Sequence, residues 1–182
     1  MLKTLFTFKK KVSEEKITNT FVNSVLLMCE EGFPEVVKIV NEDPDFVEPP
    51  QIKEENIHTF VLLVVAANLK LISKHLPAYQ DMRVMTMAYK KFAFALGYDL
   101  KSFKSKIGEI QFFCERKNHP SKNVLYALSK GFFYKYNLNQ YQQSYFKQKE
   151  VPNPMFLKRL NTVMENFLWD WEATLNKVNL VE

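Results

Sequence analysis

The chain has 182 residues, a formal net charge of +5, four glycines, sixteen phenylalanines and two cysteines, and 47% of its residues are hydrophobic. A chain of this length and composition can bury a core without the help of disulfides or metals. This excludes an intrinsically disordered protein and a disulfide-dense secreted scaffold. Cys29 and Cys114 lack the spacing of a metal or redox motif. We therefore expect one cytoplasmic domain over residues 1–182.

The first twelve residues form a basic and aromatic segment ahead of the first helix. Four large apolar residues precede Lys9, Lys10 and Lys11, but there is neither a long apolar region nor a small-residue cleavage site. The segment is therefore not a signal peptide. We expect residues 1–12 to be mobile or to pack back onto the domain. Residues 1–11 also suit peripheral contact with an anionic membrane surface.

The first helix is predicted to begin after Ser13. The serine hydroxyl can cap the free amides, and Glu14 and Glu15 complement the positive helix end. Apolar residues recur at helical spacing as far as Gly32, where the helix is expected to stop. A short second helix is then expected from Pro34, with a strand as the alternative.

Residues 41–52 are predicted to form an acidic, proline-rich loop. Its first ten residues contain three prolines and four acids, which rules out a regular helix or an inner strand. A calcium loop is not expected because the turn glycine and the glutamate at the twelfth position are missing.

The central element is predicted to be a helix at about 55–76. Residues 60–67 are eight consecutive apolar residues, and the helical pattern continues to Pro77. A helix that is apolar nearly all round belongs in the middle of a core. Its run is much shorter than the ~18 residues needed to cross a bilayer, so no transmembrane segment is expected.

Two polar residues, Asn68 and His75, fall on the apolar stripe of this helix. They are seven residues apart, roughly 10 Å along the axis, so they cannot bond each other. Each therefore needs a hydrogen-bond partner from another helix or from water. We expect two satisfied core groups. The alternative is a small internal polar site that binds a ligand or supports a reaction.

Four further helical segments are expected after Pro77. In each, apolar residues recur every three or four positions, and glycine, proline or asparagine separates it from the next. They cover 78–96, a stretch from a cap at Asp99 to a break at Asn118, 121–136 and 140–150. With a C-terminal helix, they predict an all-α domain of seven to eight helices packed around the central one.

The charges are separated along the chain. Residues 30–55 carry nine acids against two lysines, whereas residues 70–150 carry fifteen bases against five acids. Over 101–149 the bases alternate with aromatic residues that suit phosphate contact and base stacking. We take as candidate binding residues Lys101, Lys104, Tyr141 and Tyr145. Nothing here matches a helix-turn-helix or an RNA-binding signature.

The sequence contains no pattern typical of a catalytic, metal or cofactor site. Glu55 and His58 have the spacing of a di-iron ligand pair, but the second copy that such sites need is missing. There is no nucleophile elbow and no glycine-rich phosphate loop. We expect no metal and no cofactor, and we lean against an enzyme.

The C-terminal helix is predicted to run from Pro154 to about Val178. On this helix Trp169 falls in the middle of the polar face. An exposed tryptophan suggests a contact surface, since tryptophan is enriched where interfaces concentrate their energy. The alternative is that Leu5, Phe6 and Phe8 cover it.

We therefore expect a non-catalytic helical interaction protein: an adaptor, a regulator or a homo-oligomer that binds a protein partner or itself. The first alternative is a nucleic-acid-associated protein that uses residues 101–149. The second is a small-ligand protein or enzyme with a polar site at Asn68 and His75.

Overall fold

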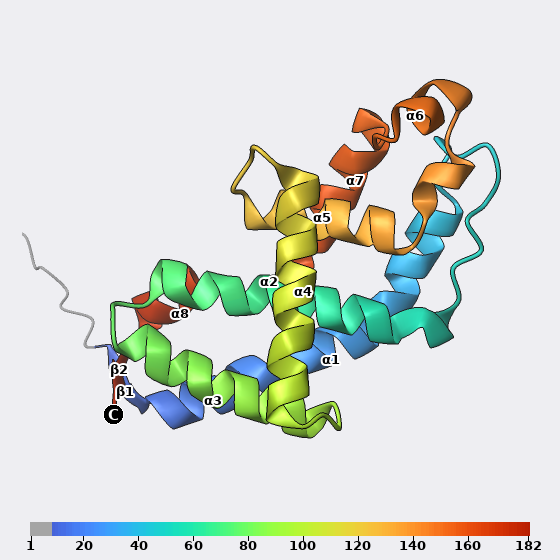
Figure 1. Ribbon diagram of the computed structural model, residues 1–182. Coiled ribbons are helices and arrows are strands. Elements are labelled where there is room, and N and C mark those ends of the chain that lie inside the picture. The colour runs from blue at the N-terminus through green and yellow to red at the C-terminus, as the bar shows by residue number, and fades with distance from the viewer. Residues whose placement is uncertain (1–8) are drawn as a thin grey trace, which may run out of the picture.

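The computed structural model describes residues 9–182 and confirms an all-α single domain (Figure 1). Two short strands pair in parallel, and 3-10 turns occur at Glu54–Asn56, Leu138–Tyr141 and Glu165–Phe167. The elements are β1 (Lys10–Ser13), α1 (Glu14–Asn41), α2 (Ile57–His75), α3 (Gln80–Ala95), α4 (Leu100–Asn118), α5 (Val124–Lys135), α6 (Ser144–Lys149), α7 (Pro154–Met164), α8 (Trp171–Lys177) and β2 (Val178–Val181).

Helix α2 lies at the centre, as predicted. Helices α1, α3, α4 and α5 all pack against it, and α4 crosses in front of it in Figure 1. The apolar run 60–67 is buried except for the half-buried Val61. By length and composition Glu54–His75 is the one described helix that could cross a membrane, but most of it is buried inside this fold, as in the core helix of a globular domain.

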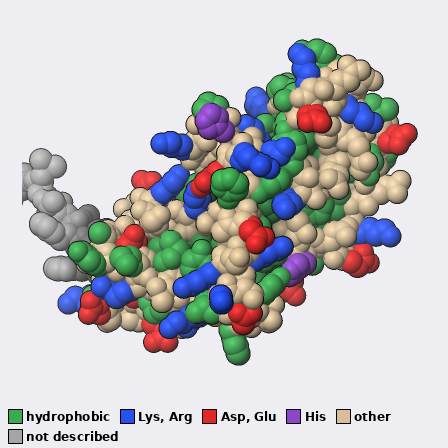
Figure 2. Space-filling view, in the orientation of Figure 1, with side chains coloured by type: hydrophobic (Ala, Val, Ile, Leu, Met, Phe, Trp, Pro, Cys, Tyr) green, Lys and Arg blue, Asp and Glu red, His purple; other side chains and the backbone are tan. Residues whose placement is uncertain are grey.

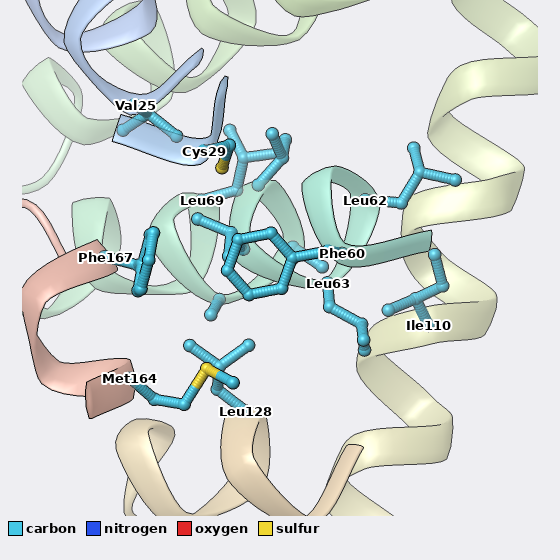
Figure 3. Close-up of a cluster of buried hydrophobic side chains, with 14 of the residues drawn as sticks. Val25, Cys29, Phe60, Leu62, Leu63, Leu69, Ile110, Leu128, Met164 and Phe167 are labelled. Atoms are coloured by element: carbon cyan, nitrogen blue, oxygen red, sulfur yellow. The ribbon is translucent and has the colours of Figure 1, made fainter. Parts of the chain in front are cut away.

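The core is built around the ring of Phe60 (Figure 3). This ring stacks on Phe33 of α1 at 4.9 Å and meets Phe132 of α5 edge-on at 6.0 Å. It also meets Phe167 of the C-terminal 3-10 turn edge-on at 4.8 Å. Three segments far apart in sequence are thus joined through one aromatic side chain of α2.

Helix α1 does not stop at Gly32, contrary to the prediction, and no separate helix or strand begins at Pro34. A Cβ at Gly32 would lie 2.7 Å from the ring of Phe167, so the missing side chain serves close packing rather than a helix end. Pro34 lies on the exposed side of α1. There water can bond the carbonyl of Glu30 that the proline leaves without a donor.

The predicted continuous helix from Pro154 to Val178 is also wrong. Helix α7 ends at Met164, the chain makes a 3-10 turn, and α8 begins at Trp171. The side chain of Asp170 caps the new helix by accepting a hydrogen bond from the Ala173 amide at 2.8 Å. The chain then ends in β2 beside β1.

Residues 10–12 belong to β1 and pack back onto the domain, which is one of the two outcomes expected for this segment. Lys10 pairs with Val178 and Ser13 with Val181, so both ends of the described chain meet. Neither strand was predicted. Residues 1–8 lie outside the described part, and so do the membrane contact predicted for this end and the cover over Trp169 proposed for Leu5, Phe6 and Phe8.

The acidic segment after α1 is irregular, as predicted, and its carboxylates hold α7. Asp43 is buried and accepts two hydrogen bonds from Arg159, at 2.8 Å from Nε and 2.7 Å from Nη2. The guanidinium also pairs with Asp45. The neighbouring carboxylates raise the pKa of Arg159, which keeps the arginine charged.

Candidate ligand-binding site

A hollow of about 450 Å³ opens between α2, α4 and α5. Most of its lining is apolar, and the loop between α4 and α5 forms one side. We call this cavity the hollow. It is lined by residues of α2 (Leu63, Ala66, Ala67, Lys70, Lys74), of α4 (Gln111, Cys114, Glu115, Asn118), of the loop (His119, Pro120, Ser121, Lys122, Asn123) and of α5 (Val124, Ala127, Leu128).

Small residues explain why the three helices leave this space. At Gly131 the helices touch: a Cβ there would lie 2.4 Å from Sγ of Cys114 and 3.1 Å from Leu63. About one turn away along α5, Ala127 lines the hollow together with Ala66 and Ala67 of α2. Three methyl groups cannot fill the space that larger side chains occupy elsewhere in the core.

Cys114 lines the hollow as a thiol, not as a thiolate. The side chain is 7% exposed, and burial raises its pKa to about 11. The thiolate is the nucleophilic form of cysteine, so this residue is unreactive near neutral pH. The wall is therefore chemically inert at its one sulfur atom.

Asn118 is buried in the wall with half of its amide unused. Its Nδ2 donates to the carbonyls of Ser121 at 3.1 Å and Asn123 at 3.0 Å, which fixes the orientation of the amide. Its Oδ1 has no hydrogen-bond partner among the described residues. Such an acceptor costs about 1–3 kcal/mol.

The rim of the hollow is positively charged. Lys70, Lys74 and Lys122 face one acid, Glu115, which pairs with Lys70. Burial, and then repulsion from Lys74, lowers the pKa of Lys70, whereas the carboxylate beside it favours the charged form. The Lys74 ammonium donates to the carbonyl of Lys122 at 3.3 Å and so ties α2 to the loop. In Figure 2 lysine and arginine side chains surround hydrophobic surface over α4 and α5.

Asn68 and His75 do not form the polar site that was the second alternative. Asn68 is completely buried, and its Nδ2 donates to the carbonyls of Val64 at 2.9 Å and Phe167 at 2.8 Å. Its Oδ1 accepts the amide N–H of Trp169 at 2.7 Å. Every polar atom of Asn68 is thus used to hold the chain where the C-terminal helix breaks. His75 is exposed at the end of α2.

His75 instead lies in a shallow groove together with Trp169, next to the hollow. Lys74 and Asn123 line both the groove and the hollow, so the two are continuous. The expected exposure of Trp169 is wrong: the side chain is half-buried, and its ring meets Phe21 at 6.0 Å and Trp171 at 6.4 Å. The break before α8 turns it toward the core.

The four candidates in the basic middle do not converge. Lys101 and Lys104 lie on the first turns of α4, and Lys104 is 5.8 Å from the ring of Tyr89. Tyr141 is half-buried against Phe46. Tyr145, on α6 at another end of the molecule, is exposed (Figure 1). Its hydroxyl accepts from Lys149 at 2.6 Å, and the same ammonium lies over its ring.

His58 belongs to a structural contact. Its Nε2 lies 2.8 Å from the hydroxyl of Tyr98, and the two rings stack. Within residues 9–182, no three histidine, cysteine or acidic side chains are grouped as metal ligands are.

Sequence reasoning did not find the hollow. Of the residues that line it, Cys114 was considered only for the spacing of metal and redox motifs, and Asn118 only as a helix break. The usable signal was the placement of Ala66, Ala67, Ala127 and Gly131 in helices otherwise rich in large apolar residues. Comparisons with known protein families, curated proteins and solved structures found no match to this chain.

Proposed function

We propose that this protein is a non-catalytic helical binding protein, a regulator that holds a small molecule in the hollow between α2, α4 and α5. The observation that carries the proposal is a cavity of about 450 Å³ with a mostly apolar wall and three lysines, Lys70, Lys74 and Lys122, in its lining. Small-molecule sites combine this size with apolar walls and a few polar groups.

Two features favour binding over chemistry. Burial keeps Cys114, the one thiol in the wall, protonated at neutral pH. The acid at the rim, Glu115, is paired with Lys70 and so is not free to act as a base. The groups that meet in the hollow suit recognition of a molecule more than its transformation.

The adaptor and homo-oligomer roles, the cytoplasmic location and the nucleic-acid alternative stay predictions. The nucleic-acid reading is weakened by internal contacts of the basic middle. Lys117 lies 3.9 Å from the ring centre of Tyr134, and Lys135 lies 4.5 Å from that of Phe113. Rings covered in this way offer less surface for base stacking.

A neutral apolar dye tests whether the hollow binds anything. Nile red should bind the folded protein once per chain, with a rise in fluorescence. Ala127→Trp places an indole in the hollow and should weaken binding at least tenfold. The matched control is Ala95→Trp, at an exposed alanine of α3 outside the hollow. The proposal would be contradicted if the dye did not bind the folded protein, or if it bound Ala127→Trp as tightly as the unchanged protein.

A further inference from the structure

We infer that the molecule held in the hollow is a small anionic amphiphile, whose apolar body lies in the hollow and whose anionic group lies at Lys74 and Lys122. This inference rests on the proposed function and adds the chemical class of the ligand. It follows from how the charges of the rim are arranged.

The positive charge at the mouth is only partly balanced. Glu115 pairs with Lys70, but no carboxylate of residues 9–182 forms an ion pair with Lys74 or Lys122. Both lysines are exposed, so their ammonium groups are hydrated and accessible to the anionic group of a ligand in the hollow. The contact from the Lys74 ammonium to the Lys122 carbonyl places the two residues side by side.

The start of α5 adds to this positive end of the hollow. Asn123 and Val124 are the cap and first residue of a twelve-residue helix, and both line the hollow. A helix N-terminus carries partial positive charge and amide donors that favour an anion. Opposing charge comes from Glu165 and Asp170, which line the neighbouring groove and not the hollow itself.

The apolar part of the ligand follows from the floor. Leu63, Ala66 and Leu128 are buried there and present hydrocarbon. An ion without an apolar body would leave this surface in contact with water, and a neutral hydrocarbon would not use the lysines. A molecule with both parts uses both surfaces.

Three ligands with the same ten-carbon chain separate these contributions. Decanoate, decanol and decyltrimethylammonium should each displace Nile red from the full-length protein, below their micelle concentrations. We expect decanoate to bind about tenfold more tightly than the cation, with decanol between them. Added salt should weaken the binding of decanoate and leave the binding of decanol unchanged.

Variants then locate the anion. Lys74→Gln with Lys122→Gln should weaken decanoate about five- to tenfold and change decanol less than twofold. The control is Lys38→Gln with Lys90→Gln, which removes the same charge at exposed lysines outside the hollow. It should leave decanoate unaffected.

Each outcome supports or overturns a separate claim. Equal affinities for the three ligands, or equal loss in both double variants, would overturn the anionic class while the binding function stands. Failure of every ligand and of Nile red would overturn the binding function as well.

Discussion

Two buried asparagines, Asn68 in α2 and Asn118 at the end of α4, have opposite roles. At Asn68 both amide atoms are used, by the carbonyls of Val64 and Phe167 and by the N–H of Trp169. At Asn118 the nitrogen is used but Oδ1 has no partner among the described residues. Asn68 joins α2 to the C-terminal break through satisfied hydrogen bonds, whereas Asn118, beside the hollow, keeps a buried oxygen unpaired.

The difference shows that burial of a polar side chain does not mark a functional site. What matters is whether the fold already satisfies its hydrogen bonds. A satisfied group contributes to stability, so its loss is felt in folding. A group whose acceptor stays unpaired contributes less to folding. The two residues should therefore respond differently to the same substitution.

The largest effect is expected for Asn68→Leu. The change removes three hydrogen bonds and leaves the Phe167 carbonyl and the Trp169 amide buried without partners, at about 1–3 kcal/mol each. We expect a loss of about 3–5 kcal/mol in urea unfolding followed by circular dichroism. A loss below about 1 kcal/mol would show that the C-terminal break does not depend on this joint.

Trp169→Ala comes next, because the indole is half-buried against Phe21 and Trp171. Truncation should cost about 2–3 kcal/mol, less than for a fully buried aromatic residue. Sedimentation should show an unchanged association state. Unchanged stability together with weaker self-association would instead restore the contact surface that the sequence suggested.

Asn118→Leu should cost only about 1 kcal/mol. It removes two hydrogen bonds to the carbonyls of the exposed residues Ser121 and Asn123, which water can replace, and it also removes the unpaired oxygen. The same urea titration measures the change. A loss of stability as large as that of Asn68→Leu would mean that Asn118 also holds the fold together. The proposed difference between the two asparagines would then be wrong.

The smallest effect concerns the pH dependence of the two thiols. Burial raises the pKa of Cys114 from 9.0 to about 11, so at pH 8 about a hundredfold less thiolate is present than in an exposed thiol. Alkylation by iodoacetamide, followed by peptide mass spectrometry, should be slow at pH 8 and rise toward pH 11. Cys29, with its pKa raised to about 12, should lag behind.

The sign of the matching stability change is fixed. Both raised values disfavour the thiolate in the folded state, so the unfolded chain loses its protons first as the pH rises past the ordinary thiol pKa. Stability should then fall with increasing pH. Fast labelling of Cys114 at pH 7 would mean that the wall of the hollow is open and polar.

Local patterns predicted much of this fold. The apolar run of α2 and the caps at Ser13 and Asp99 act within a few residues, and the structure confirms them. The continuity of α1 was missed because Gly32 packs against Phe167, a residue far along the chain. The break before α8 was missed because it is held by Asn68, 101 residues away from Trp169.

The candidate site was harder to predict for a related reason. A cavity forms where small side chains on three different helices meet in space. The pattern of any single helix does not show this. Asn118 itself was read only as a helix break. Its unpaired oxygen becomes visible when the partners of its amide nitrogen, Ser121 and Asn123, are placed.

The most direct test is a two-dimensional ¹⁵N–¹H NMR titration of the protein with decanoate that follows the side-chain amides of Asn68 and Asn118. We expect the Asn118 amide signals to shift as the hollow fills, while those of Asn68 do not move. Signals of Asn118 that stay fixed at saturating decanoate, or Asn68 signals that shift as much, would contradict this expectation.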